Sequence, residues 1–376
     1  MITFFSNFIN DHQIPFCNAM YERTGGEFRF VATEPFSEER IKLGFKDDTE
    51  KFPYVVKSYE NEEEYQKALD LGKNSDVVII GSAPDEFIVD RLKENKLTFR
   101  YSERFFKRGK WRIFDPRVFL AHFKGNFRYR KKNLHMLCAS AYTAPDCRFI
   151  SSYPKKTYKW GYFPPVKSYD NVDALLQSKK KNSILWCGRF IDWKHPEKGV
   201  IVAKKLKDAG YDFTLDMIGI GPLEHKVKKL IQKYGLQKEV TLYGAMSPEE
   251  VRTHMEENEI FLFTSDKNEG WGAVLNESMN SACAVVASSA IGSAPYLIET
   301  GKNGVIYKNG SNKDLYEKVK SLIDDSEKRA QMGKEAYLTL ERTWNAKSAS
   351  KRLLELIESI QKGEEPKEKD GPCSRD

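Results

Sequence analysis

Two glutamates stand in a segment that is otherwise small and largely apolar, KNEGWGAVLNESMNSACAVVAS at residues 267–288. The first is Glu269, and Glu277 follows with seven residues between them. A segment this rich in Gly, Ala, Ser, Val and Leu is expected to pack closely against a sheet, where an unpaired charge is costly. Either Glu277 faces solvent or a polar group pairs with it.

The spacing of the two carboxylates limits the chemistry they can share. If residues 269–277 formed one helix, the carboxylates would be separated by ~12 Å along the axis and ~80° around it. Two carboxyl groups that act as acid and base on one glycosidic bond stand roughly 5–10 Å apart across that bond. The spacing instead favours two carboxylates that hold hydroxyl groups at the two ends of a long polar ligand, such as a nucleotide sugar.

Two cations lie in the segment LWCGRFIDWKHPEKG at residues 185–199. Arg189 directly follows a predicted strand, and Lys194 precedes a helix expected to begin near His195. Ligands of open α/β sheets bind at the carboxyl ends of the strands, and a helix N-terminus attracts anions. The two cations therefore predict a diphosphate site; the alternative is two ordinary surface cations in a chain with 61 Lys and Arg residues.

Two further strand ends carry glycine. The segment IGIGPLE places Gly219 and Gly221 after a predicted strand, where the backbone could approach a ligand, although a tight turn explains the glycines equally well. The segment YGAMS follows the next strand, and free backbone groups there could meet a nucleotide base; its candidates are Gly244, Ala245 and Met246.

The elements that must position these residues alternate along the second half of the chain. Short apolar runs predict strands, and the intervening segments have helical spacing or helix-start signals; Ser247, Pro248 and Glu250 in particular form a capping-box signature. The predicted strands are 183–188, 214–221, 239–244, 260–265, 284–288 and 301–307. The predicted helices are 196–209, 223–234, 248–257 and 271–282. This alternation indicates parallel βαβ units and a doubly wound sheet.

The first half repeats the pattern less regularly, with predicted strands at 2–6, 27–33, 53–56, 76–82 and 97–102. Two Rossmann-like α/β domains are implied, joined near WGYFPPVKSYDN, with a cleft between them as the default ligand site. We predict a first domain at 1–165, a second at 166–344, a helix at 345–362 that packs back towards the first domain, and a tail at 363–376. The tail, GEEPKEKDGPCSRD, is predicted to be disordered because it has no apolar anchor.

Composition bounds the class of protein. A hydrophobic content of 40% with 12% aromatic residues indicates a folded globular chain. No run approaches the ~20 apolar residues of a membrane span, and MITFFSNFINDHQ is interrupted too early for a secretory signal, so we expect a cytoplasmic protein. The six cysteines form no C-x-x-C pair, which indicates neither a zinc site nor a disulfide framework. We predict no metal.

Positive charge is concentrated at residues 100–132. This basic window holds twelve Lys or Arg and only two acids, a charge of +10, whereas the whole chain carries +7. Nine aromatic residues are interleaved with the cations. The combination suits a membrane interface or single-stranded nucleic acid; the alternative is a solvated basic loop.

The sequence resembles the retaining glycosyltransferases with the GT-B fold, the glycosyltransferase group 1 or family four type. The resemblance rests on EGWGAVLNE, GRFIDWKHPE and IGIGPLE, which occur in the expected order and lie within 183–345. In the first half, SNFINDHQIPFCNAMYERTGGEFRFVATEP, GSAP and FRYSERFFKRG are similar to bacterial members that build exopolysaccharide or capsule. The resemblance implies two facing Rossmann-like domains with a cleft between them.

The resemblance also implies roles. Arg189 and Lys194 would neutralise the diphosphate of a nucleotide-sugar donor, a UDP-sugar in the first place and a GDP-sugar as the alternative, without a metal or another cofactor. Glu269 would hold the hydroxyls of the donor sugar, and Glu277 those of the ribose. Backbone donors at the helix start would come from Gly270, Trp271 and Gly272.

The first domain departs from the family. Many members carry a Gly-Gly loop after the first strand and a histidine near a later strand end, where this chain reads SNFINDHQ and FRYSER. His12 therefore becomes a candidate catalytic group. The candidates for contact with the transferred sugar or the acceptor are Asn10, Ser102, Glu103 and Arg104.

The implied reaction is front-face transfer of a hexose, with retention, to a glycan or a polyprenyl-diphosphate-linked acceptor in cell-surface polysaccharide synthesis. Residues 100–132 would touch the inner face of the plasma membrane and no nucleic acid. Three alternatives stay open: a nucleotide-sugar epimerase of the same fold, a phosphorylase that would need a lysine for pyridoxal phosphate, and a non-catalytic module that binds nucleic acid. The oligomeric state is open.

Overall fold

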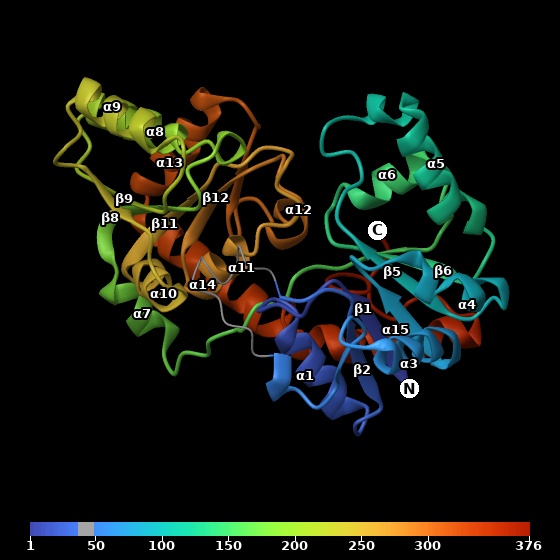
Figure 1. Cartoon of the computed structure of the whole chain (residues 1–376). Helices are drawn as coiled ribbons and strands as arrows, with labels where there is room; N and C mark the ends of the chain where they lie inside the picture. Colours follow the sequence, from blue (N-terminus) through green and yellow to red (C-terminus); the bar gives the residue numbers. More distant parts are fainter. Residues whose placement is uncertain (37–48) are drawn as a thin grey trace. The chain divides into compact units, whose positions relative to one another are not determined.

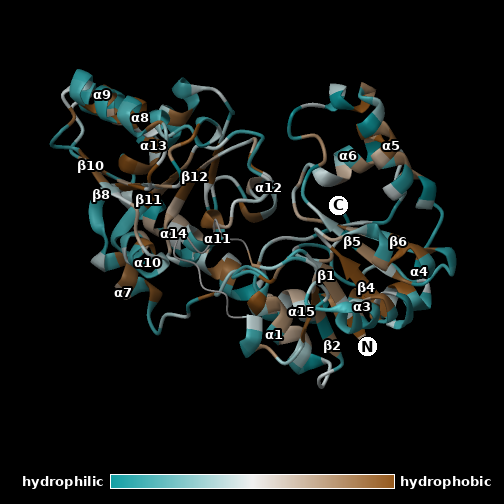
Figure 2. Ribbon diagram, in the orientation of Figure 1, coloured by the Kyte–Doolittle hydropathy of each residue, from teal (hydrophilic) through white to brown (hydrophobic). Residues whose placement is uncertain are grey.

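The computed structural model describes residues 1–36 and 49–376, which fold as two compact units (Figure 1). Unit 1 comprises Met1–Pro165 and Asn345–Asp376, and unit 2 comprises Val166–Trp344. Figure 2 shows the strands largely in the brown of hydrophobic residues, whereas helices such as α3 and α9 are mostly teal. This distribution is typical of parallel sheets covered by helices, whose strands are buried on both faces.

Unit 1 contains a seven-stranded parallel sheet in the order β3-β2-β1-β4-β5-β6-β7. The strands are β1 Ile2–Ser6, β2 Phe28–Ala32, β3 Val55–Lys57, β4 Val77–Ile80, β5 Thr98–Ser102, β6 Leu134–Cys138 and β7 Thr157–Lys159. The direction in which strands are added reverses between β1 and β4, and such a switch point is where open α/β sheets bind ligands. The last two strands, β6 and β7, extend the sheet beyond the strands that the sequence predicted.

The helices of unit 1 have local start signals. The side chain of Asn61 caps α3 by accepting from the Glu64 amide, and three glutamates occupy its first turn, where the helix dipole favours negative charge. The α-helices are α1 Ile14–Arg23, α3 Glu62–Asn74, α4 Val89–Lys93, α5 Pro116–Gly125, α6 Thr143–Phe149 and α15 Ala346–Lys362. Short 3₁₀ turns are η1 Thr49–Lys51, η2 Asp85–Phe87, η3 Lys110–Phe114 and η4 Phe127–Tyr129.

The C-terminal segment belongs to unit 1. Helix α15 packs on α1, where Arg23 Nε donates to Ser350 Oγ at 3.0 Å. Beyond the helix, the Cys373 amide donates to the Lys159 carbonyl at 2.8 Å, and the Lys159 amide donates to the Ser374 carbonyl at 2.9 Å. Residues 371–374 are buried, so the predicted disorder of 363–376 does not describe this segment. Its anchor is the open main-chain edge of β7, which needs no apolar sequence to pair with it.

Unit 2 contains a six-stranded parallel sheet in the order β10-β9-β8-β11-β12-β13. The strands are β8 Lys180–Cys187, β9 Thr214–Ile218, β10 Val240–Gly244, β11 Asn258–Phe263, β12 Ala284–Ser288 and β13 Val305–Tyr307. A buried core from β8, β9, β11 and β12 includes Trp186, Met217, Leu262 and Val286. The strand order again reverses beside the first strand of the unit, between β8 and β11.

The helices of unit 2 are α7 Val172–Ser178, α8 Glu197–Asp208, α9 Glu224–Tyr234, α10 Pro248–Glu257, α11 Val274–Asn280, α12 Ala294–Leu297, α13 Asn312–Ile323 and α14 Ser326–Arg342, with the 3₁₀ turn η5 Asp192–Lys194. The predicted capping box of α10 is confirmed: Ser247 and Glu250 each accept from the main-chain amide of the other. Among residues 1–36 and 49–376, no helix combines the length and the apolar character that crossing a bilayer requires.

Candidate active site

The predicted donor residues all lie at the carboxyl edge of the unit 2 sheet. Four neighbouring strands, β10, β9, β8 and β11, end side by side because the sheet is parallel and these strands are adjacent. Their exits carry, in that order, residues 244–246, 219–221, 188–194 and 264–272. One edge therefore gathers residues that are up to 84 positions apart in the sequence, from Gly188 to Gly272.

The exits of β8 and β9 are joined backbone to backbone. The Gly188 amide donates to the Ile218 carbonyl at 3.0 Å, and the Phe190 amide donates to the Ile220 carbonyl at 2.8 Å. Gly219 has a φ of 131°, and a Cβ atom there would lie 1.9 Å from the Gly188 carbonyl oxygen. Gly219 therefore has no room for a side chain, because the two loops pack closely at this point.

Arg189, on the β8 exit loop, is exposed. Gly221 is held against Phe190: a Cβ atom at Gly221 would lie 2.6 Å from the Phe190 carbonyl oxygen. At the next exit, the Gly244 carbonyl accepts from the Gly219 amide at 2.7 Å. Ala245 is exposed there. Met246 is half-buried, so this exit can present both backbone and side chain to a ligand.

Lys194 and Glu269 form an ion pair at the exits of β8 and β11. Lys194 Nζ lies 2.5 Å from Glu269 Oε2, and the two side chains are 14% and 10% exposed. Ser265 Oγ donates to the same carboxylate oxygen at 2.8 Å. A carboxylate this buried is costly unless it is paired and hydrogen-bonded, and both partners are present here.

A hydrogen-bonded chain holds the loop that carries Lys194. Trp186 Nε1 donates to Thr264 Oγ1 at 2.8 Å, and that hydroxyl donates to the Lys194 carbonyl at 2.7 Å. His195 has a left-handed φ of 51°, and its Nε2 lies 3.4 Å from Asp266 Oδ2. The sequence analysis did not identify Trp186, Thr264 or Asp266 as site residues, because their contacts connect two loops about 70 positions apart.

The turn after Glu269 is built around glycine. Gly272 has a φ of 89°, and a Cβ atom there would lie 2.4 Å from Cζ of Phe263. Trp271 is buried, and its Nε1 donates to Asn276 Oδ1 at 2.8 Å. Helix α11 begins only at Val274, so the two glutamates do not share one helix and the spacing expected for a continuous helix does not apply.

Glu277 lies on α11 and is half-buried. The pKa of the Cys187 thiol, at the end of β8, is raised to about 12, first by burial and then by the negative charge of Glu277. The charge of Lys194 lowers the pKa of the same thiol. Glu277 and Lys194 therefore both lie within electrostatic reach of one sulfur atom, which brings Glu277 to the same edge as the ion pair.

In unit 1, two of the predicted acceptor-side residues meet on Tyr162. The Tyr162 hydroxyl donates to Glu103 Oε1 at 2.6 Å, and the His12 ring stacks on the Tyr162 ring with centroids 5.6 Å apart. Lys107 Nζ donates to the other oxygen of Glu103 at 2.5 Å. Tyr162 lies in the predicted linker segment WGYFPPVKSYDN, where nothing local in the sequence marks it as a site residue.

The other unit 1 candidates make local contacts. Asn10 Oδ1 accepts from the His12 amide at 3.1 Å, which fixes the turn after β1. Ser102 Oγ donates to the Glu103 carbonyl at 2.9 Å. The Arg104 guanidinium lies over the Tyr142 ring, 4.6 Å from its centroid.

Two Rossmann-like units in one chain correspond to the GT-B fold. Solved structures share this fold. The Anabaena protein HepE in complex with UDP matches with a TM-score of 0.70 at 14% identity, covering 95% of this chain and 99% of HepE. WaaG, a glycosyltransferase involved in lipopolysaccharide biosynthesis, matches with a TM-score of 0.62 at 14% identity, covering 95% of this chain and 99% of WaaG.

Residues 170–339 match the family described as glycosyl transferases group 1. An uncharacterized glycosyltransferase of Methanocaldococcus jannaschii is 32% identical over 164 residues, which is 43% of this chain and 44% of that protein. The chain thus aligns with slightly less than half the length of this curated relative.

Proposed function

We propose that the chain is a retaining, metal-independent hexosyltransferase that uses a UDP-sugar and acts in cell-surface polysaccharide synthesis. The observation that carries the proposal is the buried pair of Lys194 and Glu269 beside the exposed Arg189 and the half-buried Glu277, all at one sheet edge. A nucleotide sugar has a negative diphosphate between two hydroxylated ends. Two cations and two carboxylates supply the charge and the hydrogen-bond acceptors that such a ligand needs.

Each side chain has a role in the proposed reaction. Arg189 and Lys194 neutralise the diphosphate as its bond to the sugar breaks, which is the charge stabilisation that a metal supplies in other enzymes. Glu269 orients Lys194 and accepts from the sugar hydroxyls, and Glu277 accepts from the ribose. The base lies by residues 244–246, and the amides of residues 270–272 serve as further donors.

The acceptor approaches the same face of the sugar from which the diphosphate departs. Its oxygen bonds to the anomeric carbon as the carbon–oxygen bond to the diphosphate breaks, and its proton passes to a departing phosphate oxygen. No side chain forms a covalent intermediate. His12 and Glu103, joined through Tyr162, are the proposed contacts of the acceptor, with Asn10, Ser102 and Arg104 around them. The complex of HepE with UDP supports the choice of donor.

Ligand-dependent thermal unfolding tests the donor proposal. UDP, GDP, ADP and their glucose conjugates are added to the full chain at about a hundred times their dissociation constants, where binding stabilises the folded state by ~2.7 kcal/mol. UDP and UDP-glucose are expected to raise the melting temperature, and Arg189→Ala and Glu277→Ala to abolish the shift. Lys204→Ala, which removes an exposed ion pair with Asp208, is the control that keeps it. A shift unchanged in both site variants would refute the proposal.

We further propose that the acceptor is a glycan or lipid-linked and that part of the basic window meets the inner face of the plasma membrane. The start of the window turns inward, since Arg100 pairs with Asp85 at 2.9 Å and Phe106 is buried. The outward part is η3 and α5. Its exposed apolar side chains are Trp111 at 68%, Phe114 at 85%, Phe119 at 55%, Leu120 at 46% and Phe123 at 41%.

Charge accompanies these aromatic residues. Arg117 is 93% exposed at the start of α5, and Arg108, Lys110 and Lys124 are exposed around it. Aromatic rings beside cations suit the boundary between headgroups and acyl chains of an anionic bilayer, where each cation contributes about 1 kcal/mol. We call η3 and α5 the aromatic-basic face.

A further inference from the structure

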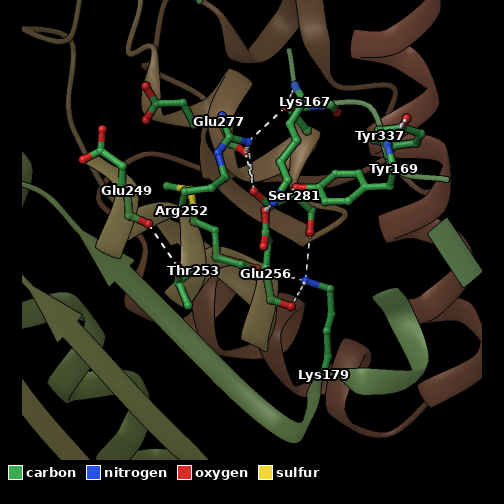
Figure 3. A network of polar contacts seen from close by, with 12 residues as sticks. Lys167, Tyr169, Lys179, Glu249, Arg252, Thr253, Glu256, Glu277, Ser281 and Tyr337 are labelled. Carbon is green, nitrogen blue, oxygen red and sulfur yellow. Dashed lines mark hydrogen bonds and ion pairs between the residues drawn. The ribbon is translucent and has the colours of Figure 1, made fainter. Parts of the chain in front are cut away.

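A polar network outside the candidate active site encloses the carboxyl end of α11 (Figure 3). Arg252, on α10, donates through Nη1 to the carbonyl of Glu277 at 3.1 Å, to Asn280 Oδ1 at 3.0 Å and to Ser281 Oγ at 3.1 Å. The Glu277 carbonyl also accepts from the Ser281 amide and from Ser281 Oγ, at 3.0 Å each, and the carbonyls at a helix end carry partial negative charge. A guanidinium is therefore well suited to bind this end.

The first residues of unit 2 join the same network. The Lys167 amide donates to Asn280 Oδ1 at 2.8 Å, and Asn280 Nδ2 donates back to the Lys167 carbonyl at 3.0 Å. Lys167 Nζ and the Tyr169 hydroxyl both donate to Glu256 Oε1 at 2.6 Å. The segment that enters unit 2 is thus fastened to both α10 and α11.

A buried lysine, Lys179, binds main-chain carbonyls next to this network. Lys179 Nζ donates to four main-chain carbonyls, those of Met255, Glu256, Asn258 and Ser281, at 2.8–3.0 Å. These carbonyls lie at the end of α10, at the start of β11 and just past the end of α11. They fix the ends of these elements relative to one another, so the surroundings of Arg252 are held on several sides.

We propose that Arg252 is a positioning residue for Glu277, an inference that rests on the proposed function. Helix α11 has only seven residues, and Glu277 is three positions from its last residue, Asn280. Arg252, together with the Ser281 amide and hydroxyl, holds the Glu277 carbonyl and so fixes the helical turn that carries the Glu277 carboxylate. A carboxylate that holds ribose hydroxyls needs its geometry fixed to within a fraction of an ångström.

A double-mutant cycle separates positioning from a structural role. Dissociation constants of UDP are measured by calorimetry for wild type, Arg252→Met, Glu277→Gln and the double variant. Arg252→Met is expected to weaken UDP binding about tenfold in the wild-type background and by less than about twofold in the Glu277→Gln background, because the effect passes through Glu277. Arg252→Lys, which keeps the charge, is expected to recover part of the loss.

Control variants show whether a negative result contradicts the role of Arg252 alone or the proposed function as a whole. Lys334→Met removes an ion pair with Asp173 elsewhere in unit 2 and is expected to leave UDP binding unchanged. Should Arg252→Met fail to fold by circular dichroism, the same cycle is run with Arg252→Lys, with the same criterion of non-additivity. An equal loss in both backgrounds, or no loss, overturns the role of Arg252 alone. A wild-type chain that binds neither UDP nor a UDP-sugar overturns the proposed function and this inference together.

Discussion

Lys194 Nζ and Glu269 Oε2 lie 2.5 Å apart in a site from which solvent is largely excluded. One residue follows β8 and the other follows β11, so the contact joins two loops at the switch point of the unit 2 sheet. An ion pair of this kind adds little net stability, since desolvation offsets its attraction, but removal of one partner leaves a buried charge. We therefore propose that the pair serves ligand binding rather than the stability of the fold.

Breaking the ion pair is expected to separate stability from activity. Glu269→Gln or Lys194→Met alone should lower the free energy of unfolding by ~3–5 kcal/mol, because each leaves a buried charge without its partner. The double variant should recover much of that loss and yet transfer no sugar. Chemical denaturation and a turnover assay with UDP-glucose measure the two properties. Activity in the double variant would show that the pair is only structural.

Much of the fold follows from the sequence, because parallel strands buried on both faces appear as short apolar runs between helical segments. The same argument placed Arg189 and Gly244 at strand ends, where the structure also has them. The pairing of Lys194 with Glu269 could not be predicted, because nothing local in the sequence specifies which of two loops 75 positions apart will touch.

Other features of the structure could not be predicted from the sequence, for different reasons. The Tyr162 hydroxyl binds Glu103, and the Tyr162 ring stacks on His12. Neither contact produces a periodic pattern in the sequence from which it could be predicted. The C-terminal segment was predicted to be disordered from its composition, yet it pairs through its main chain with β7, and main-chain pairing does not depend on side-chain type. The close packing of Gly219 against Gly188 likewise joins two segments that are distant in the sequence.

The turn after Glu269 should tolerate no side chain at Gly272. Gly272→Ala introduces a Cβ atom 2.4 Å from the buried Phe263 ring at a φ of 89°, so we expect a loss of about 3 kcal/mol or more in the free energy of unfolding and a loss of turnover. Gly235→Ala is the matched control: its φ is 62°, but nothing lies within 4 Å of the new atom, so the cost should be about 1 kcal/mol. Equal costs for the two variants would contradict the packing argument.

The alkylation rate of the Cys187 thiol should depend on the charges around the end of β8. A thiol with a pKa of about 12 carries about a thousandfold less thiolate at pH 8 than one at the usual 9.0, so its alkylation by iodoacetamide should be slow. Glu277→Gln removes a charge that raises this pKa, and the rate should increase. Lys194→Met removes a charge that lowers it, and the rate should fall.

Peptide mapping by mass spectrometry follows Cys187 separately from the other five cysteines, which are buried. Unchanged rates in both variants would place the two charges farther away.

The aromatic-basic face should bind anionic bilayers. On α5 and η4, Phe119 stacks with Phe123 at 6.2 Å and Phe123 with Phe127 at 5.5 Å, which makes a continuous row of rings along the surface. The double variant Phe114→Ser, Phe119→Ser is expected to reduce co-sedimentation with vesicles containing anionic lipid about tenfold or more, while soluble UDP-glucose turnover stays intact.

Binding should weaken as salt rises and be lost on vesicles of neutral lipid, because the cations interact with the negative surface. Tyr59→Ser removes another exposed ring of unit 1, at 39% exposure and outside the face, and should have no effect. Equal loss from Tyr59→Ser, or equal binding to neutral vesicles, would mean that general surface hydrophobicity rather than this face brings the chain to the bilayer.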